Sequence, residues 1–417
     1  MDSAASLADW LSYLERQHPA EIELGLDRVR TVAERLLSPL NSKVITVAGT
    51  NGKGSTVRLL QALLNAHGYR VATFTSPHLI QYNERVCIDG QALDDQTLCS
   101  GFAAVEAVRN EVPLTYFEFS TLGALWCFAQ QTLDYLILEI GLGGRLDSVN
   151  VIDSDIAVIT SVQLDHQDWL GDDLESIGFE KAGIMRRNSV VVCGPDMPKS
   201  VLAHAESLHC PILLSGADFS LIKESDESWS WQNQDLSIAD LPEPHLPINS
   251  LAIAIQVLLL LLPEPELTTV RDVVAECTLA GRNQHLTVED KSLLLDVAHN
   301  PAAAILLADR LQRQPVNGRT HVLLAMLKDK DWEGVVVALK EVVDGGWFLA
   351  ELKNERALPA AQLADTLYDH DVSMVSLNKN IRQALRRALS VMGTEDRLLV
   401  CGSFYTVAGV LELINAR

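Results

Sequence analysis

A glycine-rich segment with a lysine in it carries the clearest chemistry in the chain. An apolar run at residues 44–47 is typical of a buried strand, and the letters G-T-N-G-K-G-S at 49–55 join it to a helical pattern. Glycines let backbone N–H groups approach phosphate oxygens, a helix N-terminus favours negative charge, and Lys53 adds a full positive charge. The segment therefore predicts a phosphate cradle, with a tight glycine-rich turn as the alternative.

The match to the common phosphate loop G-x-x-x-x-G-K-[ST] is imperfect. Val47 stands where the first glycine of that loop belongs, and Gly54 follows the lysine in place of Ser or Thr. A dinucleotide-binding turn is disfavoured, because no acid ends a strand about 20 residues later. Nucleophilic hydrolysis is also disfavoured, since the chain has no G-x-S-x-G elbow and no reactive-cysteine signature. Phosphoryl chemistry is the interpretation that remains.

Three polar side chains lie at or just beyond the carboxyl ends of strands predicted near this loop. They are Ser76, Glu139 and His166. Because such ends converge on one crevice in a doubly wound sheet, we expect the three to lie close together. A hydroxyl, a carboxylate and an imidazole would suit Mg²⁺ bound to nucleotide phosphates, although His is an uncommon ligand for it. A hydrogen-bonded loop histidine remains the alternative for His166. An acid that closes an apolar strand, as Glu139 does, is costly unless paired or metal-bound.

Two further sites each have two interpretations from residue types alone. Lys181 lies on a predicted helix, where a solvated lysine is the interpretation that composition favours. In the second half, Asp296 ends an apolar strand, and His299 and Asn300 follow just before Pro301, which suits the first turn of a helix. A turn stabilised by Asx side chains is the alternative there.

The order of elements predicts an α/β fold in two domains. Apolar strands at 44–47, 70–75, 134–140 and 155–162 alternate with helices, which indicates a doubly wound parallel sheet. The polar stretch 215–247 predicts short antiparallel strands. We place a boundary after residue 283, giving domains 1–283 and 284–417. The smaller second domain should alternate strands at 292–297, 321–326, 346–350 and 398–401 with helices at 301–312, 332–343, 359–368 and 378–392.

Composition and charge restrict the partners. The chain has 417 residues, 48% of them hydrophobic, and a formal net charge of −22, which argues against nucleic-acid and anionic-membrane surfaces. Seven scattered cysteines without a C-x-x-C pair indicate reduced thiols and a cytoplasmic location. No signal peptide is visible. The longest apolar stretch, at 251–262, is too short to span a bilayer. We expect a monomer that takes small-molecule substrates.

Together the motifs resemble the Mur ligase superfamily and, within it, the folylpolyglutamate synthase/dihydrofolate synthase branch. The resemblance covers nearly the whole chain in the family's order, and the combination is highly specific. It also accounts for the imperfect phosphate loop, because the superfamily's own version reads G-T-N-G-K. The matching segments are G-T-N-G-K-G-S (49–55), T-S-P-H-L (75–79), L-T-Y-F-E-F (114–119), L-E-I-G-L-G-G-R-L-D (138–147), L-D-H (164–166), E-K-A-G-I (180–184), D-V-A-H-N-P (296–301), D-K-D (329–331) and C-G-S-F (401–404).

The resemblance implies an ATP-dependent amide ligase. Such an enzyme adds L-glutamate to 7,8-dihydropteroate, and to (poly)glutamylated tetrahydrofolates, through an acyl phosphate, releasing ADP and phosphate. It implies a P-loop N-terminal domain of the Mur ligase central type, a Rossmann-like C-terminal domain, and ATP with Mg²⁺ at two sites. The alternatives are a folylpolyglutamate or dihydrofolate synthase restricted to one reaction, a ligase for another carboxylate, and a non-catalytic ATP-binding regulatory protein.

The resemblance also assigns roles to residues of this chain. It implies catalytic roles for Lys53, a carbamylated Lys181 and His299, and a metal site at Ser76, Glu139 and His166. The residues implied for ATP are Thr50, Asn51, Gly52, Lys53, Gly54, Ser55, Asn249, Arg282 and Asp296. Those implied for the pterin are Glu23, Leu24, Gly25, Leu26, Thr115, Tyr116, Phe117, Glu118, Leu146, Asp147 and Ser148. Two positions depart from the family pattern: Asn283 replaces an aromatic residue after the arginine, and Tyr405 stands where His often follows C-G-S-F.

Overall fold

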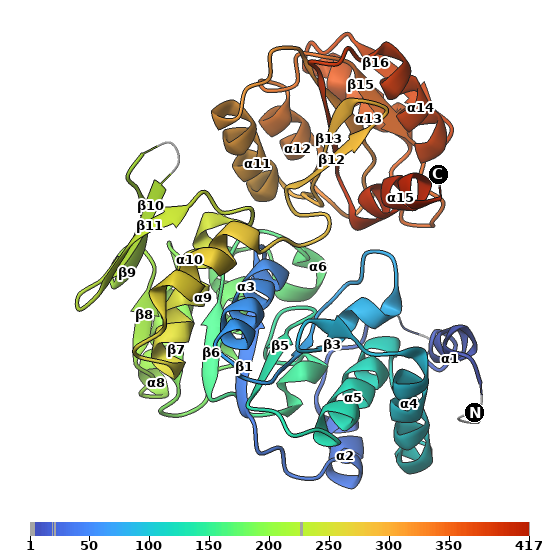
Figure 1. The fold of residues 1–417 in the computed structure, drawn as a ribbon. Coiled ribbons are helices and arrows are strands. Elements are labelled where there is room, and N and C mark those ends of the chain that lie inside the picture. The colour runs from blue at the N-terminus through green and yellow to red at the C-terminus, as the bar shows by residue number, and fades with distance from the viewer. Residues whose placement is uncertain (1–4, 19, 21, 226–227, 417) are drawn as a thin grey trace. The chain divides into compact units, whose positions relative to one another are not determined.

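The chain forms two compact units, Met1–Cys277 and Thr278–Arg417. They are seen in a computed structural model that describes residues 5–18, 20, 22–225 and 228–416 (Figure 1). The boundary expected from the sequence, after residue 283, lies a few residues further along the chain. Residues 1–4, on which the expectation of no signal peptide partly rests, lie outside the described part.

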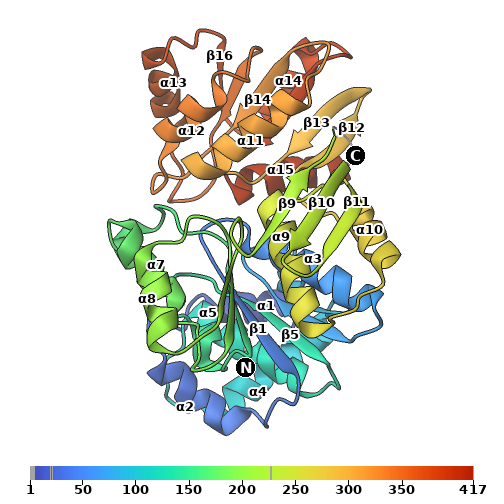
Figure 2. The ribbon, with the colours of Figure 1, turned by 90° about the vertical axis from the view of Figure 1, so that its left-hand side faces the viewer.

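The first unit is built on an eight-stranded sheet in the order β4-β3-β2-β5-β1-β6-β7-β8, most of whose strands are labelled in Figure 1. Figure 2 shows β1 and β5 of this sheet from the side. Strands β2, β5, β1, β6, β7 and β8 run parallel, and β3 and β4 add an antiparallel edge. The predicted α/β class is confirmed, but four predicted strands were too few. The strands are β1 (Lys43–Ala48), β2 (Val71–Phe74), β3 (Val86–Ile88), β4 (Gln91–Ala92), β5 (Tyr135–Glu139), β6 (Ile156–Ile159), β7 (Val190–Cys193) and β8 (Ile212–Leu214).

Helices cover both faces of this sheet, as a parallel sheet with buried strands requires. Helices α3 and α9 pack on one face, and α5, α4, α1 and α2 contribute to the core on the other. The helices are α1 (Leu7–Leu14), α2 (Asp27–Leu36), α3 (Lys53–Ala66), α4 (Asp95–Arg109), α5 (Tyr116–Ala129), α6 (Gln167–Leu170), α7 (Leu174–Ala182), α8 (Lys199–Ser207), α9 (Ile248–Leu261) and α10 (Leu267–Glu276), with 3₁₀ turns η1 (Tyr82–Arg85) and η2 (Ser148–Val151).

A three-stranded antiparallel sheet packs on α9 and α10, and it confirms the strands expected at 215–247. Its strands are β9 (Phe219–Lys223), β10 (Ser228–Asn233) and β11 (Ser237–Pro242), in the order β11-β10-β9. The buried Trp231 indole donates to the Ala252 carbonyl of α9 over 3.1 Å. That contact ties the small sheet to the helix that packs on α3.

The second unit is a six-stranded sheet in the order β12-β13-β17-β14-β15-β16, parallel except for β12. The predicted strands correspond to β13, β14, β15 and β17, whereas β12 and β16 were not predicted. The helix expected from residue 378 was placed too early, because Asn378 closes β16 and Asn380 caps the helix by accepting from Gln383 N (2.9 Å). The elements are β12 (Gln284–Val288), β13 (Lys291–Leu295), α11 (Pro301–Arg313), β14 (Thr320–Leu324), α12 (Trp332–Leu339), β15 (Trp347–Ala350), α13 (Ala360–Asp369), β16 (Val375–Asn378), α14 (Ile381–Val391), β17 (Arg397–Cys401) and α15 (Phe404–Asn415).

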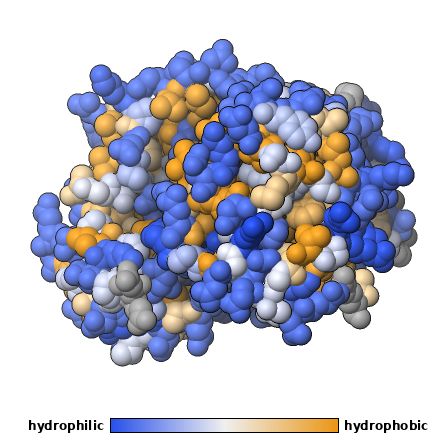
Figure 3. All heavy atoms as spheres, turned by 90° about the horizontal axis from the view of Figure 1, so that it is seen from above, coloured by the Kyte–Doolittle hydropathy of each residue, from blue (hydrophilic) through white to orange (hydrophobic). Residues whose placement is uncertain are grey.

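Hydrophilic residues cover most of the face drawn in Figure 3, with smaller hydrophobic patches between them. This surface accords with the excess of 55 acidic over 33 basic residues. Within the described part of the chain, no helix combines the length and hydropathy that a membrane crossing needs.

A close approach of α4 to α5 gives a stability prediction. A Cβ at Gly101 would lie 2.8 Å from both the Gly123 carbonyl oxygen and the Cys127 sulfur. The Gly101→Val variant should therefore lower the free energy of unfolding by about 1–3 kcal/mol through overpacking. Urea unfolding followed by circular dichroism measures this change. The matched control is Gln96→Val on the exposed side of the same helix, and an equal loss in both variants would contradict the prediction.

Candidate functional site

The predicted phosphate loop connects β1 to α3, and two of its glycines cannot be replaced without strain. Gly52 caps α3 with φ +87°, in the left-handed region. Gly49 has φ +152°, and a Cβ there would lie 1.9 Å from the Thr160 hydroxyl oxygen. Lys53 is the first residue of α3. The loop thus brings open backbone and a cation to a helix N-terminus, which is the arrangement that binds phosphate.

The segment after β6 holds this loop in place. The Thr50 N–H donates to the Ser161 carbonyl (2.9 Å), and the Asn51 N–H donates to the Ser161 hydroxyl (3.0 Å). The Thr160 hydroxyl donates to the Asn51 carbonyl (2.7 Å), and the Asn51 amide donates to the Gln163 side chain (2.7 Å). These supporting residues were not among the predicted site residues, because nothing local in the sequence marks them.

Two further contacts place Lys53 and the start of α9 at the same loop. The Lys53 ammonium donates to the Gly49 carbonyl over 2.9 Å, so it lies back across the loop. The Ser250 hydroxyl donates to the Gly52 carbonyl over 3.2 Å. Asn249, a predicted nucleotide contact, is exposed immediately before Ser250 and therefore lies beside the loop.

The predicted metal-binding residues lie at the carboxyl edge of the parallel strands β2, β5 and β6, of which β2 and β5 are neighbours and β6 lies beyond β1. Glu139 ends β5 and is buried, and its carboxylate accepts from the Ser76 N–H beyond β2 (3.1 Å). His166 follows β6, and its backbone N–H donates to the Asp165 carboxylate (2.9 Å). Among the described residues no group of three or more His, Cys, Asp and Glu is arranged to hold a metal ion. The buried Glu139 carboxylate beside a serine nevertheless fits Mg²⁺, which prefers few protein oxygens and keeps waters and phosphate as other ligands.

Lys181 lies in the last turn of α7 and is 3% exposed, so the interpretation as a solvated lysine is wrong. Burial, followed by the charge of Lys53, lowers the pKa of Lys181 to about 7, although the Asp165 carboxylate opposes the shift. A substantial fraction of its amine is therefore neutral near neutral pH. A neutral amine is nucleophilic, which an ordinary surface lysine is not.

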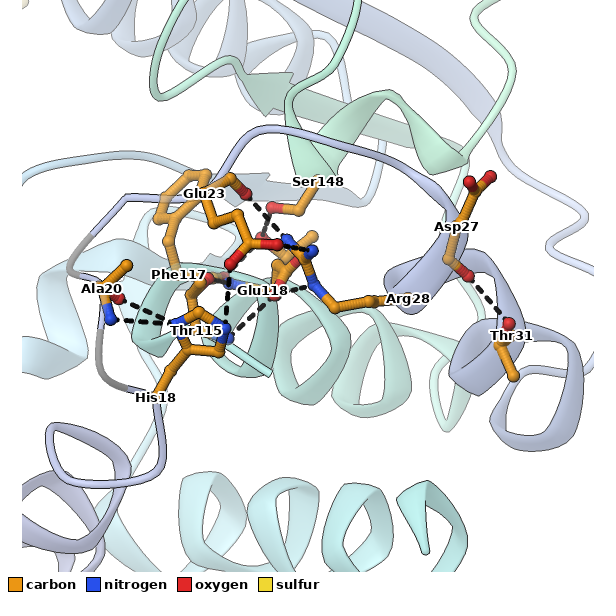
Figure 4. Close-up of polar contacts among 11 residues, drawn as sticks. His18, Ala20, Glu23, Asp27, Arg28, Thr31, Thr115, Phe117, Glu118 and Ser148 are labelled. Atoms are coloured by element: carbon orange, nitrogen blue, oxygen red, sulfur yellow. Dashed lines mark hydrogen bonds and ion pairs between the residues drawn. The ribbon is translucent and has the colours of Figure 1, made fainter. Parts of the chain in front are cut away.

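The three segments predicted for the pterin lie together, although they are far apart in the sequence (Figure 4). The Gly25 N–H donates to the Leu146 carbonyl (3.1 Å), which joins the first segment to the third. The Arg28 guanidinium donates to the Glu118 carboxylate (3.0 Å) and to the Glu23 carbonyl (2.9 Å), and it also pairs with the Glu23 carboxylate. These bonds join the first segment to the second.

Side chains of the second and third segments complete the group. Thr115 and Glu118 form the capping box of α5, and Ser148 shares a 2.8 Å hydrogen bond with Thr121 of α5. The Phe117 ring packs against Gly141: a Cβ added at Gly141 would lie 2.6 Å from Cζ of the Phe117 ring. Asp147 is buried, and its burial raises the pKa of its carboxyl to about 6 although two backbone N–H groups donate to it.

Arg85 is buried, and it was not among the predicted site residues. Its guanidinium carbon lies 5.6 Å from the Tyr82 ring centre and 5.7 Å from that of Tyr116, a predicted pterin residue. The Arg85 Nε–H donates to His78 Nδ1 over 2.8 Å. Arg85 therefore links the T-S-P-H-L segment to the start of α5.

The predicted residues of the second unit lie around one loop. The Asp296 carboxylate accepts from the Asn283 and Ala298 N–H groups, each over 2.9 Å. The Arg282 guanidinium carbon lies 5.0 Å from the Phe404 ring centre, and the His299 ring lies 6.2 Å from the same ring. Asn283 is buried with φ +43°, a conformation that asparagine tolerates better than an aromatic residue. The other departure, Tyr405, is 52% exposed.

The ion pair between Arg28 and Glu118 gives a second stability prediction. Replacing Arg28 by methionine leaves the buried Glu118 carboxylate without its cation, so the free energy of unfolding should fall by about 1–3 kcal/mol. Arg30→Met is the matched control, because its pair with Asp27 is exposed and should be worth less than about 1 kcal/mol. Chemical unfolding measures both. Adding Glu118→Gln to Arg28→Met should recover part of the loss, and two single losses that simply add would contradict the pairing.

Most of the chain matches the models of two protein-family domains. Residues 47–250 match the Mur ligase middle domain, and residues 281–404 match the Mur ligase, glutamate ligase domain. The dihydrofolate synthase/folylpolyglutamate synthase of Escherichia coli (strain K12) is 44% identical over 418 residues, covering 100% of this chain and 97% of that protein.

Two solved structures are similar over the full length. E. coli FolC in complex with DHPP and ADP has a TM-score of 0.95 at 43% identity, with coverage of 100% of this chain and 99% of that one. A bifunctional folylpolyglutamate synthase/dihydrofolate synthase with Mn, AMPPNP and L-glutamate bound has a TM-score of 0.92 at 43% identity, with the same coverage. The chain therefore belongs to the dihydrofolate synthase/folylpolyglutamate synthase family of Mur ligases.

Proposed function

We propose that this protein is an ATP-dependent ligase that adds L-glutamate to 7,8-dihydropteroate and to (poly)glutamylated tetrahydrofolates. A carboxylate oxygen of the pterin substrate attacks the γ-phosphorus of ATP, and ADP leaves. The glutamate amine then attacks the acyl carbon, the amide bond forms, and inorganic phosphate leaves with one oxygen of the original carboxylate. The phosphate cradle at Gly49 and Lys53 carries this proposal, since it lies in a chain similar over its whole length to enzymes of this activity.

Phosphoryl transfer explains why this cradle is combined with buried acids. A carboxylate is a poor electrophile until one of its oxygens becomes a phosphate leaving group. Thr50, Asn51, Gly52, Gly54 and Ser55 would hold the ATP phosphates through the loop and the start of α3. Lys53 would turn from its own loop to the phosphates and stabilise the charge in transfer. Asn249, Arg282 and Asp296 are the remaining proposed nucleotide residues.

Ser76, Glu139 and His166 are the proposed holders of divalent metal. Mg²⁺ at two sites would neutralise charge on the phosphate oxygens. Glu139 is the one acid among these three residues, and so small a number of protein ligands suits a metal whose other ligands come from ATP and water. Manganese accompanies AMPPNP in one of the similar structures.

The three segments that the Arg28 and Gly25 hydrogen bonds join together form the proposed pterin pocket. A pterin ring presents both donors and acceptors, and the pocket offers the Asp147 carboxyl, the Thr115 and Ser148 hydroxyls and the Phe117 ring. Leu24, Leu26 and Tyr116 add apolar surface at its margin. The E. coli protein that resembles this chain is described in complex with DHPP and ADP, which supports a pterin site in this fold.

The remaining assignments rest on chemistry and composition. His299 would assist the reaction of the glutamate amine, and Lys181, once carbamylated, would become an anion facing the metal region. We place the protein in the cytoplasm, which accords with its seven free cysteines, and we propose that it is a monomer.

The direct test of function is a two-substrate ligase assay. Sustained ADP release over many turnovers should require ATP, L-glutamate and either dihydropteroate or a tetrahydrofolate together. Turnover with one of the two pterins would identify a monofunctional synthase. ATP binding without turnover on either pterin would favour the non-catalytic regulatory protein and contradict the proposal.

Lys53→Ala should lower turnover by about 10²–10³-fold, because one charge that stabilises the transferring phosphoryl group is lost. Circular dichroism should show an unchanged fold, since the Lys53 side chain contacts its own loop and packs no core. Lys199→Ala, an exposed lysine on α8, is the matched control and should keep wild-type turnover. Full activity in Lys53→Ala would count against the cradle.

Lys181 should form a carbamate with dissolved CO₂. Its neutral amine adds to the carbon of CO₂, an N–C bond forms, and one proton is released to solvent. Because the pKa of Lys181 is lowered to about 7, the neutral amine and hence the carbamate should increase from pH 6 to pH 8. Carbon NMR with ¹³C-bicarbonate should show a carbamate signal that is absent in Lys181→Gln and retained in Lys199→Gln. A spectrum identical in wild type and Lys181→Gln would refute this assignment.

A further inference from the structure

The Phe404 ring lies close to the side chains of Arg282 and His299, to both of which the proposed function gives roles. Phe404 is the first residue of α15, directly after β17. Its ring centre lies 5.0 Å from the Arg282 guanidinium carbon, within the range of a cation–π contact. The His299 ring lies 6.2 Å away on the same phenyl group, tilted by 54°.

Phe404 sits on a firmly held turn. The Ser403 hydroxyl caps α15 by accepting from the Thr406 N–H (3.1 Å), and the Thr406 hydroxyl donates to the Ala325 carbonyl beyond β14 (2.7 Å). A side chain at Gly402 would collide with the same carbonyl, at 2.6 Å. The position of the ring is therefore set by the sheet, and the ring can act as a fixed surface.

The backbone around Arg282 is fixed, and its guanidinium donates to the Gly281 carbonyl over 3.4 Å besides lying over the Phe404 ring. The Asn283 N–H donates to Asp296, and the Val297 N–H donates to the Gly281 carbonyl (2.9 Å). An arginine side chain has several rotatable bonds, and holding its guanidinium before a ligand arrives reduces the entropy lost on binding. The residue that follows Arg282 is asparagine in this chain, so the aromatic surface against the guanidinium comes from α15.

We propose that Phe404 is a positioning residue that holds the Arg282 guanidinium through a cation–π contact, ready for the phosphates of the nucleotide. The inference rests on the proposed role of Arg282 as a nucleotide contact. It adds to that role a residue whose own side chain has no group that could bind phosphate.

The experiment replaces Phe404, in the full-length protein, by phenylalanines with one, two and three ring fluorines. Fluorine withdraws electron density from the ring face with little change in ring size, so it weakens a cation–π contact and leaves packing nearly intact. Calorimetric titration with AMPPNP and Mg²⁺ gives the dissociation constant of each variant. The same series at Phe348, a buried ring beside His321 in the same unit, is the matched control.

The dissociation constant for AMPPNP should rise stepwise with fluorination at Phe404, reaching about 3–5-fold, and should stay constant at Phe348. Phe404→Leu should show a similar loss of AMPPNP affinity, and Phe404→Tyr, which keeps an aromatic ring, should bind AMPPNP as tightly as the wild type. In turnover, the loss should appear in KM for ATP and not in KM for the pterin.

Three results would overturn the inference. Affinity that is independent of fluorination would show that the ring only packs, and equal losses at Phe404 and Phe348 would show a general loss of stability. If the unsubstituted protein binds no AMPPNP, the nucleotide site itself is wrong and the inference fails with it. If AMPPNP binds with an affinity that does not depend on fluorination, only the inference about Phe404 is contradicted, and the ligase proposal is not.

Discussion

The approach of Gly49 to Thr160 is the constraint on which the rest of the site depends. A Cβ at Gly49 would lie 1.9 Å from the Thr160 hydroxyl oxygen, so the loop after β1 meets the segment after β6 only with glycine there. At this distance Thr50 and Asn51 bond to residues 161–163, which fixes the loop before any ligand binds. Helix α3 can then begin at Lys53, beside the strand ends that carry Glu139 and Ser76.

Much of this arrangement could be predicted from the sequence, because parallel strands place their carboxyl ends at one edge. The apolar run before Glu139 marked its strand, and the structure brings its carboxylate to the Ser76 N–H. Arg28 had no such local signal. Its partner Glu118 lies 90 residues away, and their contact depends on how α2 packs against α5. A single arginine on an amphipathic helix looks the same whether it is solvated or paired.

Lys181 shows where reasoning from composition fails for a physical reason. Helix α7 packs so closely on the glycine-containing segment 141–147, which follows β5, that a Cβ at Gly144 would lie 3.0 Å from the Lys181 carbonyl. Lys181 is 3% exposed at this packed end of α7, and helical periodicity does not reveal such packing. The family resemblance identified the residue, and its lowered pKa explains why its amine could react. Asn283 is a second position that composition does not explain, because only its backbone φ of +43° shows why asparagine is accepted there.

The central claim is that one carboxylate oxygen of the substrate passes through an acyl phosphate formed at the Lys53 loop. The most direct measurement uses dihydropteroate labelled with ¹⁸O in both carboxylate oxygens, with ATP and L-glutamate, and determines the ¹⁸O content of the released phosphate by mass spectrometry. The account predicts one ¹⁸O atom in each phosphate and one in the new amide. Phosphate free of ¹⁸O, released together with amide product, would contradict it.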